Sequence, residues 1–294
     1  MSGTAIGLIA FFFLTSRQHP FMGEVLFLLV PVAAGFSVVL VARTPDSAAA
    51  AAALLSVVCS LILLVSLGKE GVLCALLALP IIGIGLGIGA GIGILARKLF
   101  VDRSKNRTTT TGMLLLIGPA LIVAGERIER PILYHSRTEV VQTTVEVKEK
   151  PEQTWGRILS IDNVQANKPI LMYLGLPIPQ RCVTQGQGIG AKRTCYFDVG
   201  YIEETVTGWN PPYSLGLSID RTHMPGRYWL GFENAEYRLQ ASGPRTLLTR
   251  TTTISSHLQP AWYWRGFERL GVESEHEYIL RDLVRRAAHE LATP

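Results

Sequence analysis

The sequence lacks the residue groupings that most enzymes and metal sites need. It has no serine-elbow motif, no paired-carboxylate signature and no adjacent nucleophile and base, and its six histidines show no His-Glu-x-x-His spacing. Of its four cysteines, Cys59 and Cys74 lie in separate apolar runs. We therefore expect no metal and no cofactor, and no catalytic residue can be assigned.

Charge and aromatic residues are also scarce in one part of the chain. Only 17% of the 294 residues are charged, the mean hydropathy is +0.27, and every Trp and Tyr lies beyond residue 133. Such a split predicts two units. The first is an apolar helical region over 1–128, and the second is a globular domain over 138–292.

Long runs without any charge fill the first unit. A helix needs about 20 apolar residues to cross a hydrocarbon core of about 30 Å, so three of the runs are long enough and the fourth is borderline. We expect four transmembrane helices, or five if the shorter stretch Ser2–Ser16 also spans. The chain would then be an integral protein of a bacterial cytoplasmic membrane, with the lipid bilayer as its partner. The four runs are Val25–Ala42, Ser47–Gly68, Gly71–Ala96 and Thr108–Gly125.

No membrane run carries a charge in its middle, which argues against a transporter because ion pathways usually contain ionisable residues. The third run has Gly at every second position from 83 to 93. On a helix Gly83, Gly87 and Gly91 share one face, and small residues four apart let helices approach closely. The spacing predicts helix–helix association through these three glycines.

Basic residues indicate the orientation. The segment 97–107 holds five Lys and Arg residues, and the positive-inside rule makes it cytoplasmic. The next span then carries the C-terminal domain out of the cytoplasm, where disulfides persist. Arg127, Arg130 and Arg137 follow the last span and favour the opposite orientation.

Beyond residue 138 the pattern changes to alternation, typical of half-buried strands. Pro151 begins a short helix that ends at Leu159, and Pro260 begins a long helix that reaches about Leu291 and bends near Gly271. This order predicts an α+β fold in which the long helix lies on one face of an antiparallel sheet. The expected strands are 139–147, 181–186, 191–198, 201–209, 214–220, 235–241 and 245–255.

The segment CVTQGQGIGAKRTC, from Cys182 to Cys195, allows two interpretations. Gly186-x-Gly188-x-x-Ala191 matches a dinucleotide fingerprint, but such a site needs a helix directly after the glycines. Here a strand-like run follows, so the nucleotide interpretation fails. In a hairpin that turns at the glycines, the two cysteines face each other and could form a disulfide. The alternative is a pair of inward-facing thiols.

Four short motifs between 138 and 290 stand in a recognisable order. They are PxxxW from Pro151, GIGAxRxCxFxxG from Gly188, ExVTxW from Glu204 and PAxYW from Pro260. Together they resemble the START-like (SRPBCC) superfamily, in particular its polyketide cyclase/dehydrase and lipid-transport branch. The resemblance does not extend to the membrane region.

That resemblance implies a helix-grip fold, in which a curved sheet wraps a long C-terminal helix around an apolar cavity. Members of the superfamily bind lipids, sterols and other hydrophobic molecules, and some catalyse cyclisation or dehydration. Two positions depart from the family pattern. Arg250 and Lys150 stand where small residues are usual.

Alternation places Arg193 and Glu204 on the inward faces of neighbouring strands. A buried Arg is costly without a partner, and a carboxylate is its natural neighbour. The pair is either a stabilising salt bridge or a polar anchor for a ligand in an apolar pocket.

The long helix supplies the other candidates. His276 lies on its apolar face, as a core histidine or a general base, and the acidic segment 273–277 is interpreted as solvated. The aromatic residues near the helix start line a pocket or pack in the core. The ligand-binding candidates are therefore Arg193, Glu204, Tyr263, Trp264, Phe267 and His276.

Three functions fit these residues. The first is membrane-anchored binding of a hydrophobic small molecule or lipid. The second is a cyclase or dehydratase that uses Arg193, Glu204 or His276 as acid or base, and the third is a structural protein whose cavity is filled by its own side chains. The formal charge of +5 is partly explained by the basic segment 97–107, so we expect no nucleic acid partner.

Overall fold

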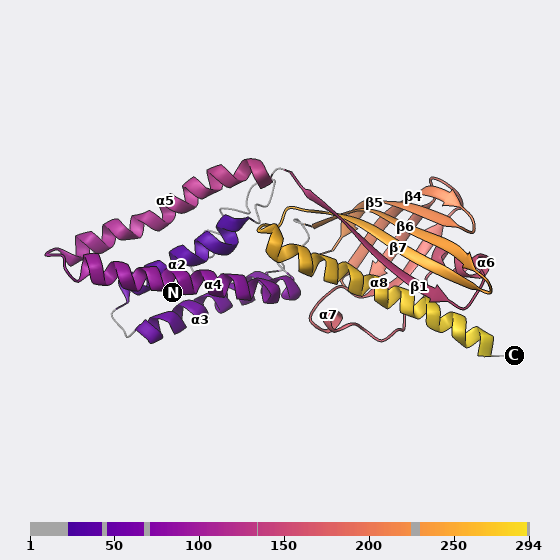
Figure 1. The fold of residues 1–294 in the computed structure, drawn as a ribbon, viewed down its shortest axis with the longest axis horizontal. Coiled ribbons are helices and arrows are strands. Elements are labelled where there is room, and N and C mark those ends of the chain that lie inside the picture. The colour runs from indigo at the N-terminus through magenta and orange to yellow at the C-terminus, as the bar shows by residue number, and fades with distance from the viewer. Residues whose placement is uncertain (1–22, 43–45, 68–70, 134, 225–229, 293–294) are drawn as a thin grey trace. The chain divides into compact units, whose positions relative to one another are not determined.

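The computed structural model describes all residues except 1–22, 43–45, 68–70, 134, 225–229 and 293–294. Ser2–Ser16 lies outside the described residues, so a fifth span stays a prediction. The chain forms two compact units (Figure 1). Unit 1 comprises Met1–Ser136 and His257–Trp264, and unit 2 comprises Arg137–Ser256 and Arg265–Pro294.

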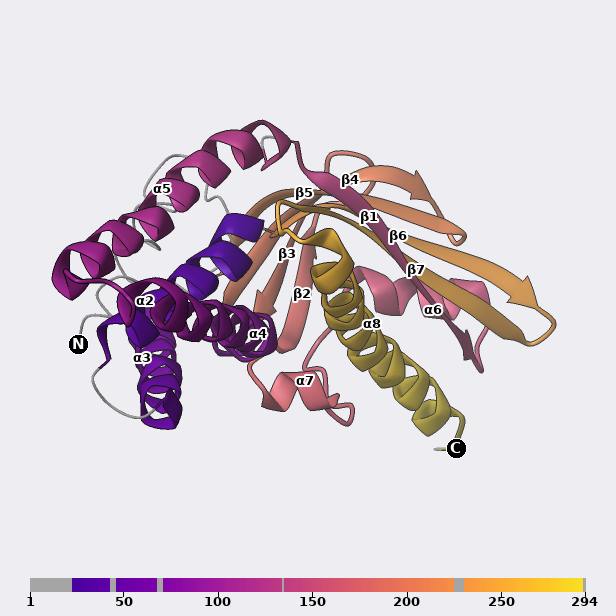
Figure 2. The ribbon, with the colours of Figure 1, turned by 60° about the vertical axis from the view of Figure 1, so that its left-hand side comes forward.

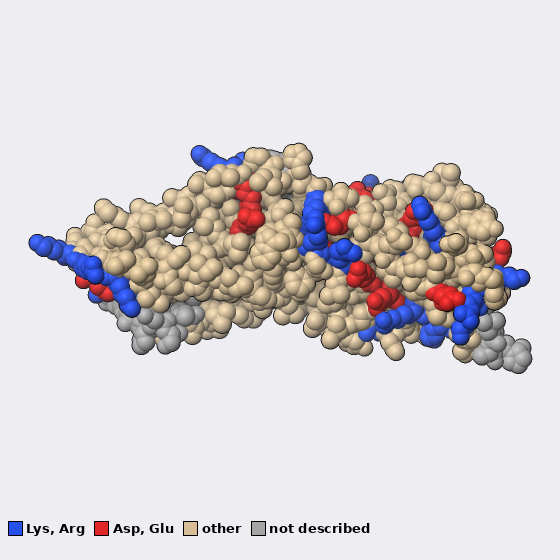
Figure 3. Space-filling view, in the orientation of Figure 1, with Lys and Arg blue, Asp and Glu red and all other residues tan. Residues whose placement is uncertain are grey.

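The described parts of the four uncharged runs in unit 1 are almost entirely helical. Two of its described helices, Val72–Val101 and Arg107–Leu133, are long and apolar enough to cross a membrane by length and composition. The surface of the helices carries few charged atoms in the view of Figure 3. The elements are η1 (Val25–Leu29), α2 (Val30–Val41), α3 (Asp46–Ser66), α4 (Val72–Ala96), η2 (Arg97–Val101) and α5 (Arg107–Leu133).

The glycines of α4 form two rows. Among the described residues, a Cβ atom added at Gly83, Gly87 or Gly91 would meet no neighbouring atom within 4 Å. The alternate row faces η1 and α2 instead, because a Cβ at Gly89 would collide with the backbone of Val32. Gly85 and Gly93 lie against the same segment, beside Pro31 and Phe36 respectively. Gly83, Gly87 and Gly91 therefore lie away from the described helices of unit 1, and helix–helix association through them stays a prediction.

Unit 2 is built on a seven-stranded antiparallel sheet in the order β1-β7-β6-β5-β4-β3-β2 (Figure 2). All seven predicted strands form, which confirms the α+β order. The strands are β1 (Arg137–Val147), β2 (Pro179–Gln185), β3 (Lys192–Phe197), β4 (Gly200–Asn210), β5 (Ser214–His223), β6 (Leu230–Ser242) and β7 (Arg245–Ser256).

Three helices complete the unit. They are α6 (Pro151–Leu159), α7 (Ile170–Tyr173), which the sequence pattern did not predict, and α8 (Ala261–Ala292). The helix α8 is continuous through Gly271, and a bend there stays a prediction. The predicted apolar face of α8 is buried in the core, from Val272 to Leu283. A long helix packed on an antiparallel sheet gives a helix-grip-like arrangement.

The glycine-rich segment is a hairpin turn between β2 and β3. Gly186, Gly188 and Gly190 have φ angles of 85°, 83° and 88°. Side chains other than glycine rarely adopt these values, so the glycines serve the turn. Strand β3 follows the glycines directly, as the sequence indicated, and no helix begins there.

Candidate functional site

Arg193 and Glu204 form the centre of a buried polar cluster. They are direct partners across β3 and β4, and their exposed fractions are 2% and 6%. Arg193 Nη1 donates to Glu204 Oε2 at 3.2 Å, and Arg193 Nη2 donates to the carbonyl oxygen of Ile158 in α6 at 3.3 Å. The short turn between the strands fixes this register, so the pair that alternation predicted is present.

A second buried arginine lies beside the first pair. Arg250 of β7 donates to Glu275 of α8 at 3.0 Å. The ring of Tyr237 lies near both arginines, with its centroid 5.8 Å from Arg193 Cζ and 5.4 Å from Arg250 Cζ. The cluster thus joins both halves of the sheet to α8.

The guanidinium groups keep unused hydrogen-bond donors. Arg193 Nε, Arg250 Nε and Arg250 Nη1 are fully buried and have no hydrogen-bond partner among the described residues. A buried donor without a partner costs free energy, about 1–3 kcal/mol for an ordinary group and more for a charged one. These nitrogens are the clearest candidates to receive an acceptor from outside the chain.

Burial also sets the protonation of the cluster. Burial raises the pKa of Glu204 above its ordinary value, and the positive charges of Arg193 and Arg250 only partly offset this. Burial acts to lower the pKa of Arg250, but the charges of Glu275, Tyr237 and Glu204 and the hydrogen bond to Glu275 together outweigh it, and the pKa is raised. Arg250 therefore stays charged, while Glu204 holds a proton more readily than an exposed carboxyl.

His276 is a fully buried part of the same interface. Its Nε2 shares a 2.7 Å hydrogen bond with Thr252 Oγ1, and its Nδ1 shares one of 3.1 Å with Thr143 Oγ1. Burial lowers its pKa to about 2, helped by the charge of Arg250. The imidazole is therefore neutral and hydrogen-bonded at both nitrogens, which makes it a weak general base.

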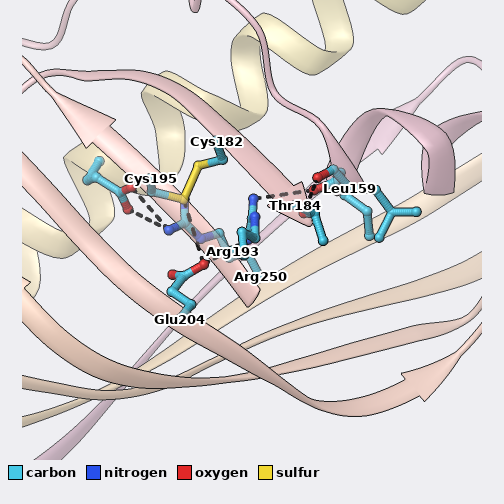
Figure 4. Close-up of a disulfide and its surroundings, with 9 residues drawn as sticks. Leu159, Cys182, Thr184, Arg193, Cys195, Glu204 and Arg250 are labelled. Carbon is cyan, nitrogen blue, oxygen red and sulfur yellow. Dashed lines mark hydrogen bonds and ion pairs between the residues drawn. A yellow bond between two sulfur atoms is a disulfide. The ribbon is translucent and has the colours of Figure 1, made fainter. Parts of the chain in front are cut away.

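A disulfide closes one side of the cluster. Cys182 and Cys195 are partners across β2 and β3, and their sulfur atoms are bonded at 2.08 Å. Figure 4 shows Arg193, Glu204 and Arg250 beside this bond. Cys195 Sγ lies 3.6 Å from Glu204 Oε2. The disulfide thus ties the strand that carries Arg193 to its neighbour, next to the ion pair.

The aromatic candidates lie elsewhere. Tyr263 and Trp264 belong to unit 1, where the Tyr263 hydroxyl donates to the carbonyl of Leu77 and the Trp264 ring lies 4.8 Å from that of Phe27. Phe267 is half-buried in unit 2. The structure brings Arg193, Glu204 and His276 into one interface and does not bring Tyr263 or Trp264 to it.

Sequence reasoning missed two charged members of the cluster. Glu275 was interpreted as solvated with the rest of the segment 273–277, yet it pairs with Arg250 and its side chain is 18% exposed. Arg250 was noticed only as a departure from the family pattern. The alternation Thr246, Leu248, Arg250, Thr252 along β7 was a usable signal, because all four side chains are buried.

An open hollow of about 380 Å³ lies between α6 and α8. Two arginines line it, Arg157 and Arg286, and both are paired with carboxylates, those of Glu149 and Asp282. None of its lining residues belongs to the buried cluster. The hollow therefore adds no donor to the site.

Comparison with known proteins gives structural likeness only. No family model matches the chain, and no curated protein matches it in sequence. Among solved structures, an aromatase/cyclase from Streptomyces is 16% identical with a TM-score of 0.38. The match covers 53% of this chain and 96% of the aromatase/cyclase chain. Norcoclaurine synthase from Thalictrum flavum is 11% identical with a TM-score of 0.37, over 53% of this chain and 98% of its own.

A START superfamily protein from Mycobacterium smegmatis is 13% identical with a TM-score of 0.37, over 51% of this chain and 97% of its own. Each of these three proteins is matched over about half of this chain. At such identities and scores the likeness carries no argument about a ligand or a reaction.

Proposed function

We propose that unit 2 binds a hydrophobic small molecule or lipid between the sheet and α8, and that Arg193 and Arg250 hold its polar end. The helices of unit 1 anchor the protein in a membrane, with the C-terminal domain on the extracytoplasmic side. The ligand would be amphiphilic, with an apolar body and an acceptor group such as a carboxylate or hydroxyl.

One observation carries this proposal. Three buried guanidinium nitrogens, on Arg193 and Arg250, have no hydrogen-bond partner among the described residues. A purely structural ion pair would be expected to use its donors, because buried unpaired polar groups are rare. The surrounding core is apolar, with Val206, Leu217 and Leu248 almost fully buried. Convergent donors in an apolar setting are the usual composition of a ligand site.

Binding is favoured over catalysis by the state of His276. Its pKa of about 2 and its two threonine hydrogen bonds leave it no role as a base near neutral pH. Of the three residues that the sequence indicated as acid or base, Arg193, Glu204 and His276, Glu204 is then the carboxylic acid that remains for proton transfer. The arginines remain charged and suit recognition better than proton transfer.

The test is to purify the full chain in mild detergent and analyse it by native mass spectrometry and solvent extraction. Arg250→Met removes two of the three unused donors. Arg250→Lys keeps the positive charge but replaces the planar guanidinium with an ammonium group. Arg245→Met is the matched control, because Arg245 lies on the same strand in an exposed ion pair with Glu146. Circular dichroism shows whether each variant is folded.

A bound small molecule should accompany the wild-type chain. Charged hydrogen bonds contribute about 1.5–3 kcal/mol each, so the affinity for the ligand should fall by about 10- to 100-fold in Arg250→Met and by less in Arg250→Lys. The amount of ligand that accompanies each purified variant should fall in the same order. Occupancy in Arg245→Met should equal wild type. No ligand in the folded wild-type chain, or equal loss in both methionine variants, overturns the proposal.

A further inference from the structure

The short helix α7 presents large apolar side chains outward. Ile170 is 75% exposed, Tyr173 is 74% exposed and Leu174 is 42% exposed. Single exposed apolar residues are ordinary on a protein surface, but three within five positions form a patch that calls for an explanation. We refer to these three residues as the α7 patch.

The α7 patch is held in place by the rest of the helix. Leu171 and Met172 are buried, and Met172 belongs to the main core of unit 2. The helix is followed by hydrogen bonds from the Leu174 and Leu176 amides to the carbonyl of Leu171. A fixed inner face means that the outer face cannot turn inward to hide its apolar atoms.

We infer that the α7 patch inserts into the headgroup layer of a lipid bilayer that contains anionic lipid. Apolar side chains carried by a helix that lies on a membrane are buried about 5–10 Å into the boundary between headgroups and acyl chains. Tyr173 suits that depth, because tyrosine places an apolar ring and a polar hydroxyl at the interface.

The charges around the α7 patch fit an anionic surface. No Asp or Glu occurs from residue 163 to residue 197, while the same stretch contains Lys168 and Arg181. The two other basic residues of the stretch, Lys192 and Arg193, are instead paired with Asp220 and Glu204. Lys168 and Arg181 are exposed and flank α7 in the sequence. Each basic residue near an anionic membrane contributes about 1 kcal/mol of attraction.

The chain itself would keep unit 2 near such a surface. This step rests on the proposed membrane anchoring of unit 1. Three residues separate the end of α5 at Leu133 from the start of β1 at Arg137, and a fully extended chain spans at most about 3.3–3.6 Å per residue. Unit 2 therefore starts within about 14 Å of the end of an apolar helix.

A second protein is a poorer occupant. A stable protein interface needs about 800 Å² from each partner, while even a large aromatic side chain buries only about 150–250 Å². Three side chains fall short of that area. A bilayer has no such minimum, because each inserted side chain contributes independently and the anchor holds the domain nearby.

The test places a photoreactive residue in the α7 patch of the full chain. The chain is reconstituted in nanodiscs of phosphatidylcholine and phosphatidylglycerol, with p-azidophenylalanine in place of Tyr173. The control carries the same group in place of Tyr213, which is 50% exposed in the turn between β4 and β5. After illumination, mass spectrometry of peptides identifies lipid adducts.

We expect about tenfold more lipid adduct at position 173 than at position 213, because only an inserted side chain stays among lipids. In the same photoreactive background, Ile170→Glu should reduce the adduct at position 173. Ile189→Glu should not, although Ile189 is 73% exposed, nearly as much as Ile170. Equal adducts at both positions, or cross-links from position 173 to protein, overturn the inference.

Failure of the related proposals gives different results. A chain that does not enter nanodiscs overturns the membrane anchoring and, with it, the docking of α7. A chain that enters nanodiscs without adducts at position 173 overturns the docking alone. Ligand occupancy in the Arg250 variants is measured in detergent and tests the buried cluster independently of both.

Discussion

The two units pack their elements by different means. In unit 1, η1 and α2 meet α4 along Gly85, Gly89 and Gly93, where one side of the contact has no side chain. In unit 2, the contact between the sheet and α8 is an apolar core that also contains buried polar pairs, with Arg250 bound to Glu275 and His276 bound to Thr252. The contact in unit 1 depends on close backbone approach, and the contact in unit 2 depends in addition on the pairing of these polar groups.

This difference determines what a substitution does. An atom added between close backbones must displace a helix, whereas an atom removed from a charge pair leaves its partner buried without compensation. In unit 2 the cost therefore depends on which partners remain.

The ion pair of Arg193 and Glu204 should show strong coupling. Arg193→Met or Glu204→Leu alone should lower the free energy of unfolding by about 3–5 kcal/mol, because each leaves one buried group unpaired. The double variant should cost less than either single change. Denaturant unfolding of the purified chain, followed by tryptophan fluorescence, measures all three variants and the wild type.

A double-mutant cycle on the exposed ion pair of Arg245 and Glu146 is the matched control. Its changes should stay within about 1 kcal/mol, as for surface ion pairs in general. Additive effects at Arg193 and Glu204 would show that the two side chains do not interact in solution, and would remove the basis of the buried cluster.

Local pattern was enough to predict the sheet and the first ion pair. Strands alternate with a period of two and end at Gly and Pro turns, and the two-residue connection between β3 and β4 fixes which residues face each other. Arg193 and Glu204 are therefore paired by local geometry. The register of β3 and β4 could therefore be predicted from the length of the connection between them.

The remaining contacts depend on long-range packing. Arg250 and Glu275 lie 25 residues apart on different elements, and the rotation of α8 against the sheet decides whether Glu275 faces Arg250 or water. The glycine rows of α4 have the same spacing of four, so the sequence alone could not show that Gly89, and not Gly87, lies against α2. The helix α7 has four residues, which are too few to show a helical period of apolar residues.

His276 should make stability fall on acidification. Its pKa is about 2 in the folded chain and 6.5 without perturbation, so its contribution is complete above pH 6.5 and is lost as pH falls. At 1.36 kcal/mol per pH unit, unfolding should be about 2 kcal/mol easier at pH 5 than at pH 7 on account of this group. His276→Gln should remove that part of the pH dependence.

The raised pKa of Glu204 acts in the opposite direction, because its contribution is present at low pH and lost as pH rises. It is common to the wild type and the variant, so the difference between their profiles isolates His276. His223→Gln is the control, since His223 is partly exposed beside Glu203. An unchanged profile in His276→Gln would contradict the buried neutral imidazole.

The smallest effect should differ in sign between neighbouring glycines of α4. Gly87→Ala should stabilise unit 1 by about 0.5–1 kcal/mol, because alanine loses less backbone entropy in a helix and the added Cβ meets open space. Gly89→Ala should destabilise it, because the same methyl group would meet the backbone of Val32, which has no flexible end to move aside. Thermal unfolding in detergent, followed by helical circular dichroism, compares the two single-methyl changes. Destabilisation by both would indicate that the row containing Gly87 is also covered, by association with a second helix.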